Sequence, residues 1–180
     1  KYSEGGSQAL VKDINVVDED WTVASANWEG TSWGYFTGDD DAMKIMSSRI
    51  VEQMEQLEVK TLLGLNEGMP TCDPVGLETY HPEVFKKFEF LTVFDLLIRY
   101  IKEGRIKLDK TRFKGPATYH DPCNYGRRAQ KRFGHGFFEE PRWILGQCVD
   151  NWTDLYPADM NQICCGGGGG ALVTGYNEER

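Results

Sequence analysis

Two adjacent cysteines, Cys164 and Cys165, run directly into five consecutive glycines near the end of the sequence. Neighbouring cysteines are poor disulfide partners for each other, because the bridge would strain the peptide between them. They are well suited to present two sulfurs to one metal cluster. Glycines lack a Cβ, so we expect the backbone of Gly166, Gly167 and Gly168 to approach a cofactor and direct N–H groups toward it. The alternative is a flexible Gly-rich linker with two incidental cysteines.

A second stretch, residues 117–123, ends in His120, Asp121, Pro122 and Cys123. The pattern predicts a short strand that Pro122 stops, because proline cannot donate to a strand ladder. Cys123 would then follow a strand end, which is where α/β folds build their sites. Histidine exchanges protons near neutral pH, so His120 is a candidate catalytic proton donor to leaving thiolates. A histidine that only holds the strand end is the alternative.

Together the two stretches resemble the cysteine-rich CCG domain of the catalytic subunits of heterodisulfide reductases. Tyr-His-Asp-Pro-Cys at 119–123 and Cys-Cys-Gly-Gly-Gly at 164–168 carry the resemblance, about forty residues apart. The residues that follow Cys123 (Asn-Tyr-Gly-Arg-Arg) and those that close the sequence (Val-Thr-Gly-Tyr-Asn-Glu-Glu-Arg) look most like the DsrK-type subunit. That subunit belongs to a membrane redox complex linked to sulfite reduction. The resemblance covers residues 111–180 and, more weakly, 20–110.

The resemblance implies a 4Fe–4S cluster of non-cubane type, with Cys123, Cys164 and Cys165 as metal ligands and a CxxC completing the set. No cysteine follows Cys165, so we expect this sequence to be a piece of a longer subunit, cut before its CxxC. In such relatives the cluster reduces a disulfide with electrons taken one at a time. The implied partners are membrane-bound redox subunits and a small sulfur-carrier protein or disulfide substrate. The implied location is cytoplasmic, peripheral at the inner face of the membrane.

The two remaining cysteines have different surroundings. Cys72 stands in a stretch rich in Gly and Pro, where the family's first module carries a cysteine motif. It is a candidate catalytic residue, or equally a loop thiol without a role. Cys148 lies on an apolar run and is expected to be a buried structural thiol outside the metal site. Two other functions stay open: a non-catalytic electron-transfer subunit, and a zinc scaffold that uses the three clustered cysteines with His120.

Composition narrows the class of protein. The 180 residues carry a net charge of −8, from 20 basic and 28 acidic side chains, which disfavours nucleic acid as a partner. Five cysteines, an odd number without the spacing of a secreted scaffold, favour a reducing cytoplasm over disulfides. Four basic residues stand close together after Cys123, namely Arg127, Arg128, Lys131 and Arg132. They either balance a cluster's charge and receive an acidic partner, or form a solvated helix face.

The elements that must position these residues indicate an α/β fold. We expect two similar modules, 1–110 and 111–180, with parallel strands, flanking helices and cysteines at the carboxyl ends of strands. The first module would be a degenerate copy with a connector, and the second would bind the cluster. Strands are predicted near 21–24, 59–65 and 116–120, with a Gly and aromatic loop at 27–38. Helices are predicted after Asp39, with an apolar stripe from Met43 to Leu57, and at 92–101, 124–132, 141–148 and from 171.

Overall fold

The computed structural model describes residues 14–15, 17–26, 32–64 and 69–167. Gly168 and the helix predicted to open at residue 171 lie outside this part of the chain. The chain forms two compact units, and each is built from two separate stretches of sequence. The first unit comprises residues 1–23 and 91–162, and the second comprises 24–90 and 163–180. Among the described residues, none of the helices is long and apolar enough to span a membrane.

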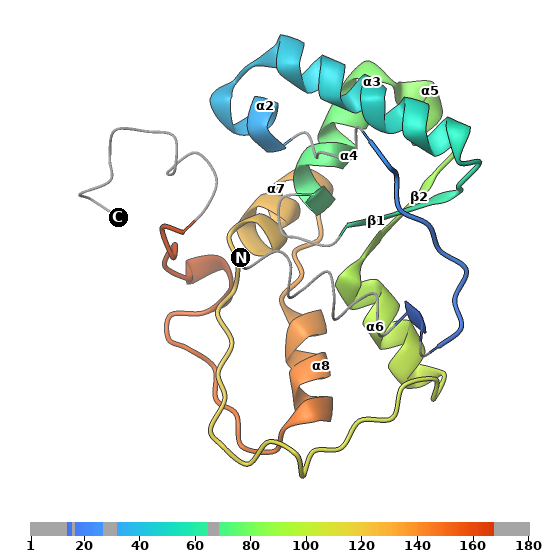
Figure 1. The fold of residues 1–180 in the computed structure, drawn as a ribbon. Helices are drawn as coiled ribbons and strands as arrows, with labels where there is room; N and C mark the ends of the chain where they lie inside the picture. Colours follow the sequence, from blue (N-terminus) through green and yellow to red (C-terminus); the bar gives the residue numbers. More distant parts are fainter. Residues whose placement is uncertain (1–13, 16, 27–31, 65–68, 168–180) are drawn as a thin grey trace. The chain divides into compact units, whose positions relative to one another are not determined.

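The second unit contains α3 (Asp40–Gln56), which begins where the acidic run predicted a helix (Figure 1). The side chain of Asp39 accepts a hydrogen bond from the N–H of Ala42 at 2.9 Å, which caps the first turn. Met43, Ile50 and Met54 of the predicted apolar stripe are buried. Leu57 is 40% exposed because it lies just past the last turn of the helix.

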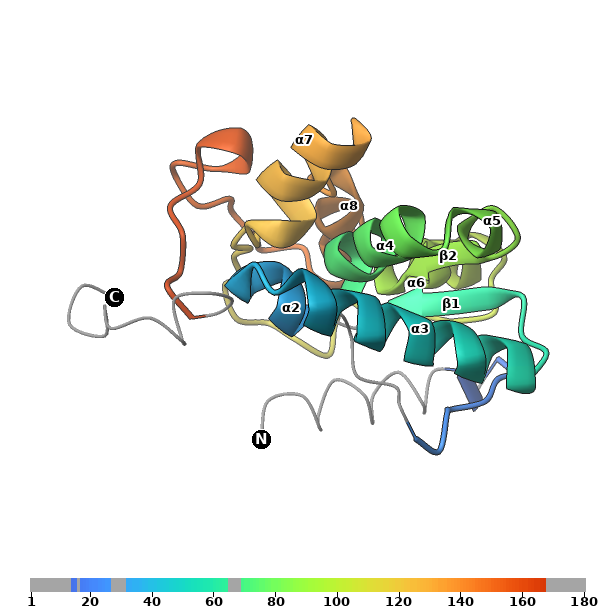
Figure 2. The same ribbon diagram turned by 90° about the horizontal axis from the view of Figure 1, so that it is seen from above.

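The strand predicted at 59–65 is confirmed as β1 (Thr61–Gly64), which pairs in parallel with β2 (Glu89–Thr92). Two helices, α4 (Met69–Tyr80) and α5 (Pro82–Phe85), connect these strands, as parallel pairing requires (Figure 2). This strand–helix–strand arrangement agrees with an α/β class. The core of the unit comprises Ile50, Val51, Met54 and Leu77, with Val59, Leu62, Val84, Phe85, Phe88 and Phe90 packed against them.

The first unit pairs α6 (Val93–Lys102) with α8 (Glu139–Cys148) (Figure 1). Between them in sequence, η1 (Asn124–Arg128) is a single π-helical turn that continues into α7 (Ala129–Phe133). The three helices predicted at 92–101, 124–132 and 141–148 are therefore confirmed. Phe94 of α6 packs on Tyr125 and Phe137, with ring centroids 4.8 and 6.0 Å apart, which joins the helices through aromatic contacts.

Two of the predicted strands are wrong. Residues 21–24 form no strand, and Trp21 and Val23 are 38% and 63% exposed, so no neighbouring sheet covers these β-forming side chains. At 116–120 the structure has a single parallel bridge, in which Ala117 exchanges backbone hydrogen bonds with Asn151 and Thr153. The flanking prolines, Pro116 and Pro122, have no N–H to extend a ladder.

Two predicted loops contain helices. Within the predicted loop 27–38, α2 (Ser32–Thr37) is helical, while residues 27–31 lie outside the described residues. A Cβ on Gly34 would lie 2.7 Å from the backbone nitrogen of Met43, so this glycine allows close approach to α3. The stretch around Cys72 is the start of α4, because proline is accepted in a first helical turn. The similarity of two modules and their boundary at residue 110 stay predictions.

Candidate functional site

The vicinal cysteines lie beside their own glycines. The N–H of Gly166 points to the sulfur of Cys164 at 3.5 Å, and the N–H of Gly167 points to the sulfur of Cys165 at 3.4 Å. Gly166 has a φ of +67°, a backbone conformation that glycine adopts without steric cost. Both cysteines are exposed. The glycines therefore provide N–H donors to two accessible sulfurs.

Cys123 precedes the π-helical turn η1 and is partly buried. The N–H of Arg128 donates to its carbonyl at 3.0 Å, which closes the wide turn. Gly126 allows the ring of Phe138 to pack against this turn, because a Cβ there would lie 2.7 Å from that ring. π-helical turns are rare and occur often at functional sites, so the backbone around Cys123 marks the segment independently of its cysteine.

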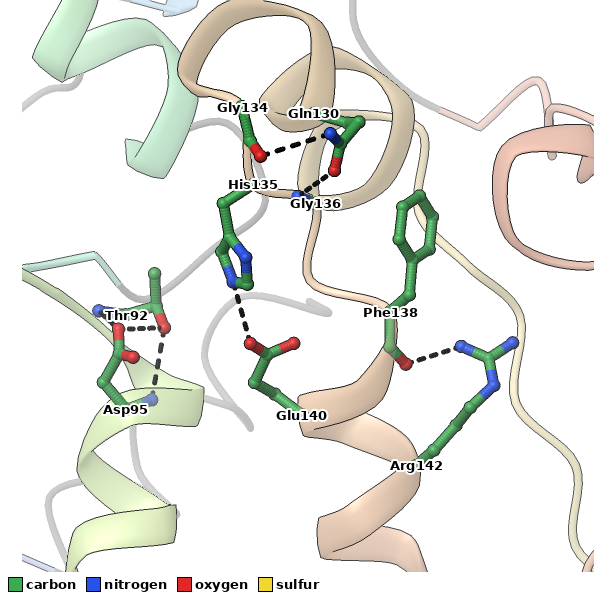
Figure 3. Close-up of polar contacts among 9 residues, drawn as sticks. All are labelled: Thr92, Asp95, Gln130, Gly134, His135, Gly136, Phe138, Glu140 and Arg142. Carbon is green, nitrogen blue, oxygen red and sulfur yellow. Dashed lines mark hydrogen bonds and ion pairs between the residues drawn. The ribbon is translucent and has the colours of Figure 1, made fainter.

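A buried ion pair lies next to Cys123, and the sequence pattern did not reveal it. Arg142 of α8 donates to both carboxylate oxygens of Asp121, at 2.7 and 2.9 Å. It also donates to the carbonyl of Phe138 at 2.6 Å (Figure 3). A further hydrogen bond from Arg142 goes to a carboxylate oxygen of Asp154 at 2.8 Å. The side chains of Arg142 and Asp121 are only 10% and 2% exposed. A bidentate pair of this kind is among the stronger polar contacts in proteins.

The ion pair fixes the charge of both partners. Burial alone would raise the pKa of Asp121, but the hydrogen bonds from Arg142 and from the N–H of Asp159 outweigh it, and the pKa is lowered. The same bond to Asp121 raises the pKa of the Arg142 guanidinium against the effect of burial. Both groups are therefore ionised across the physiological range, and each satisfies the other.

A second polar contact involves the predicted basic cluster. Arg127 donates from its guanidinium to the carbonyl of Gln162 at 2.9 Å. The interpretation of this cluster as a solvated face or a partner surface therefore missed an internal role for Arg127. The side chain of Gln162 is buried, and neither its nitrogen nor its oxygen has a hydrogen-bond partner among the residues described. Buried side-chain amides in proteins nearly always have a hydrogen-bond partner, so Gln162 is unusual in this respect.

The remaining candidates have varied environments. His120 is partly buried beside Asp121, and its proton-donor role stays a prediction. Cys72 is completely buried in α4, and its catalytic role is likewise still a prediction. Cys148 is partly buried at the end of α8, and burial raises the pKa of its thiol. His135, for which the sequence suggested no role, lies 2.8 Å from the carboxylate of Glu140 (Figure 3).

The donor chemistry suits an iron–sulfur cluster. Cys123 belongs to the first unit, and Cys164 and Cys165 belong to the second. Across the described ranges, no group of three or more His, Cys, Asp or Glu side chains is gathered closely enough to hold a metal ion. The convergence of the three thiols therefore stays a prediction. Two features fit an iron–sulfur cluster: the soft thiol donors, and the N–H groups directed at the sulfurs of the vicinal pair.

Comparison with known proteins gives several relatives. The Hdr-like menaquinol oxidoreductase iron–sulfur subunit 2 of Archaeoglobus fulgidus is 36% identical, with 81% of this chain and 31% of that protein aligned. The corresponding iron–sulfur subunit of Archaeoglobus profundus is 28% identical over 84% of this chain and 32% of its own. A probable membrane-anchored ferredoxin of Chromohalobacter salexigens is 25% identical over 93% of this chain and 24% of its own.

The chain thus spans about a third or less of the length of these relatives. No known family model matches the chain, and no solved structure matches it either. Two of these relatives are named as iron–sulfur subunits of menaquinol oxidoreductases, and the third is named as a ferredoxin.

Proposed function

We propose that this chain is part of an iron–sulfur redox subunit of the heterodisulfide reductase family, with Cys123, Cys164 and Cys165 as cluster ligands. The observation that carries the proposal is the vicinal cysteine pair with the N–H groups of Gly166 and Gly167 directed at its sulfurs. Cysteine thiolates hold iron–sulfur clusters, and hydrogen bonds to sulfur help to set their reduction potentials. The 36% identity with an iron–sulfur subunit supports the same assignment.

The finer assignment is a CCG-type module of the DsrK type, whose non-cubane 4Fe–4S cluster is completed by a CxxC elsewhere in the subunit. When bound, such a cluster supplies single electrons for cleavage of a disulfide or trisulfide. The residues of this chain would hold and tune it. The backbone of Gly166, Gly167 and Gly168 would direct its N–H groups toward the cluster. His120 would deliver a proton to the leaving thiolate. Cys72 would act near the substrate.

The proposed partners follow from the same assignment. Two relatives are named as subunits of menaquinol oxidoreductases, which favours membrane-bound redox subunits as the electron source. A small sulfur-carrier protein or a disulfide is the proposed electron acceptor, in sulfate or sulfite metabolism. The subunit would then lie in the cytoplasm, at the inner face of the membrane, held there by its partners.

A second function is electron transfer without disulfide chemistry. One relative is named a membrane-anchored ferredoxin, and the Archaeoglobus relatives are named for menaquinol rather than for a disulfide. The ligand set would be the same, but the acceptor would be another redox centre. The test uses the full-length subunit with a menaquinol analogue and with disulfides. Reduction by the menaquinol analogue without any turnover of disulfides would favour this second function.

The test of the ligand assignment compares two cysteine variants in the full-length subunit. Cys165→Ala removes a proposed ligand, so it should lose cluster iron and disulfide turnover by more than the 10–100-fold that changes around a ligand typically cost. Cys148→Ala is the matched control and should keep both, at a cost in packing of about 1 kcal/mol. Anaerobic iron content, visible absorbance and turnover with a disulfide are measured for both variants.

Either of two results would count against the proposal. Full iron and activity in the Cys165→Ala protein would remove this cysteine from the ligand set. Loss of both in the Cys148→Ala protein would show that the cluster lies elsewhere. Zinc in place of iron, with no visible charge-transfer absorbance, would instead support a zinc scaffold.

A further inference from the structure

The chain between α8 and η2 (Asp159–Asn161) displays apolar side chains on the surface of the first unit. Tyr156 is 99% exposed, and Leu155 and Met160 are 41% and 40% exposed. Single apolar side chains on a surface are ordinary, but several in one place with polar groups around them mark a contact site. Tyrosine and methionine are also enriched at protein–protein contacts. We refer to residues 154–160 as the Tyr156 loop.

Both ends of the Tyr156 loop are fastened to the buried guanidinium of Arg142. Asp154 accepts a hydrogen bond from this guanidinium at 2.8 Å, and a carboxylate oxygen of Asp159 lies 3.2 Å from it. The N–H of Asp159 also donates to Asp121 at 2.8 Å, and Asp121 is itself bound by Arg142. The two ends of the loop are therefore held beside the same side chain.

The backbone that enters the loop is fixed as well. The N–H of Ala117 donates to the carbonyl of Asn151 at 3.0 Å, and the N–H of Thr153 donates to the carbonyl of Ala117 at 3.0 Å. Within the loop, the ring of Pro157 restricts the φ angle of its own residue. The loop should thus lose little further conformational entropy when a partner binds, which favours affinity.

Carboxylates border the exposed apolar side chains. Asp154 and Asp159 flank Tyr156 in the chain, and their side chains are 38% and 56% exposed. Together with Asp121 they place three carboxylates around one guanidinium. Because Arg142 is only 10% exposed, the surface presents carboxylates rather than the cation.

Two other cations contact this stretch of chain farther from Tyr156. Lys110 pairs with Asp150 at 3.1 Å, and Arg127 donates to the carbonyl of Gln162 at 2.9 Å. Residues 149–163 themselves include three aspartates and no lysine or arginine. The apolar side chains of the loop therefore have acidic neighbours on both sides along the chain.

The acidic border selects the kind of partner. Interfaces pair surfaces of opposite charge, and like charges brought together repel each other. Anionic lipid headgroups and the phosphates of nucleic acid are therefore disfavoured. A second copy of this chain that used the same loop in a two-fold symmetric contact would set these carboxylates against each other. What fits is a different protein chain with an apolar pocket bordered by Lys and Arg.

We propose that the Tyr156 loop docks into an apolar pocket, bordered by Lys and Arg side chains, on a separate protein chain. The side chain of Tyr156 fills the pocket, and the carboxylates of Asp154 and Asp159 face its basic border. Arg142 is a positioning residue, because it holds both ends of the loop. The inference goes beyond the proposed function, since a docking surface does not depend on which cofactor the cysteines bind.

The first experiment identifies what the loop contacts in the cell. Tyr156→benzoylphenylalanine places a photoreactive ketone on the loop of the full-length subunit, which is irradiated in its native cells, and cross-linked peptides are mapped by mass spectrometry. Ile45→benzoylphenylalanine is the matched control, because Ile45 is an apolar residue of α3 that is 53% exposed in the second unit. We expect position 156, but not position 45, to cross-link to another protein chain beside Lys or Arg.

The second experiment measures the affinity of the purified full-length subunit for the cross-linked protein. Tyr156→Ala should weaken binding by about 30-fold, which corresponds to about 2 kcal/mol, as for a central interface tyrosine. Tyr156→Phe keeps the ring and should bind within about threefold of the unaltered subunit. Ile45→Ala should have no effect. Since Tyr156 is 99% exposed, its loss removes no packing from the folded protein.

Two further variants test the charges and the positioning role. Salt should weaken binding of the unaltered subunit, and Asp154→Asn, which keeps an oxygen acceptor for Arg142, should reduce this dependence. Arg142→Lys keeps the charge but loses the geometry that holds both ends of the loop. It should weaken binding by about tenfold and speed hydrogen exchange in the Tyr156 loop while leaving α6 as protected as before.

Several results would overturn the proposal. Cross-links from position 156 that stay within the subunit, join two copies of it or reach lipid would each do so, as would the absence of any cross-link. Unchanged affinity in the Tyr156→Ala variant would show that the cross-linked chain is only a neighbour. Binding that does not respond to salt would contradict the basic border of the pocket.

Discussion

The thiol of Cys148 illustrates how a single residue's surroundings set its chemistry. Burial raises its pKa above the ordinary value of 9.0, while the charge of Lys110 acts in the opposite direction. A smaller thiolate fraction reacts more slowly with alkylating agents. In metal-free protein at pH 8.5, iodoacetamide should therefore modify the exposed Cys164 and Cys165 before Cys148, as mapped by peptide mass spectrometry.

The sign of the shift predicts the effect of pH. Because the folded pKa of Cys148 is raised, its contribution to stability is present below pH 9.0 and is lost as pH rises through the folded value. Lys110→Met should raise the pKa further and slow alkylation of Cys148 at a given pH. Alkylation of Cys148 at the same rate as the exposed pair would contradict this description of α8.

At the residue scale, the sequence predicted contacts between residues that are close together in the chain. The vicinal cysteines and their glycines are adjacent in the chain, and their N–H to sulfur contacts involve residues only two apart. Asp121 and Arg142 are 21 residues apart, and nothing near either residue indicates the other. A buried ion pair of this kind depends on where α8 packs, which a single sequence does not encode as a pattern.

The start of α6 depends on one reciprocal cap. The hydroxyl of Thr92 accepts from the N–H of Asp95 at 3.2 Å, and the carboxylate of Asp95 accepts from the N–H of Thr92 at 2.8 Å (Figure 3). Thr92→Ala removes half of this arrangement, so it should lower the free energy of unfolding by about 1–2 kcal/mol. Urea unfolding of the metal-free protein measures this loss.

Thr92→Ser is the matched control, because serine keeps the hydroxyl and should cost only a few tenths of a kcal/mol. An alanine variant as stable as the serine variant would mean that packing alone holds the helix. The slope of unfolding free energy against urea should be unchanged in both, since neither change alters the surface exposed on unfolding.

Elements with a capping residue and a periodic apolar face were predictable, and short strands were not. Asp39 and Gly104 mark the start of α3 and the end of α6, where Gly104 has a φ of +71°. The predicted strand at 21–24 relied on β propensity, which reflects packing against a neighbouring strand rather than a local preference. β2, at Glu89–Thr92, was not predicted, because its four residues run directly into α6.

At the scale of the whole chain, each compact unit combines stretches that are far apart in sequence. Arg105 illustrates this in the first unit, because it donates to the carbonyl of Val17 at 2.6 Å and pairs with Glu19 at 2.7 Å. Patterns of composition and periodicity identify elements but do not say which distant elements pack together. The prediction of modules 1–110 and 111–180 was based only on the order of the motifs along the chain.

The first unit predicts what happens if the chain is divided between residues 110 and 111. Contacts that cross that point include the packing of α6 on α8, the packing of Phe94 on Tyr125, and the ion pair of Lys110 with Asp150 at 3.1 Å. Separated pieces 1–110 and 111–180 would each expose the apolar face that the other covers. We therefore expect neither to show strong protection of backbone amides from hydrogen exchange in α6 or α8.

Mixing the two pieces should restore much of that protection, because the contacts need no covalent link between residues 110 and 111. Near-ultraviolet circular dichroism, which reports fixed aromatic side chains such as Tyr125, should recover in parallel. The outcome that contradicts this account is a 111–180 piece whose α8 amides are as protected alone as in the whole chain. That result would mean that the cysteine-bearing module folds by itself, and that the aromatic contacts of Phe94 add little to its stability.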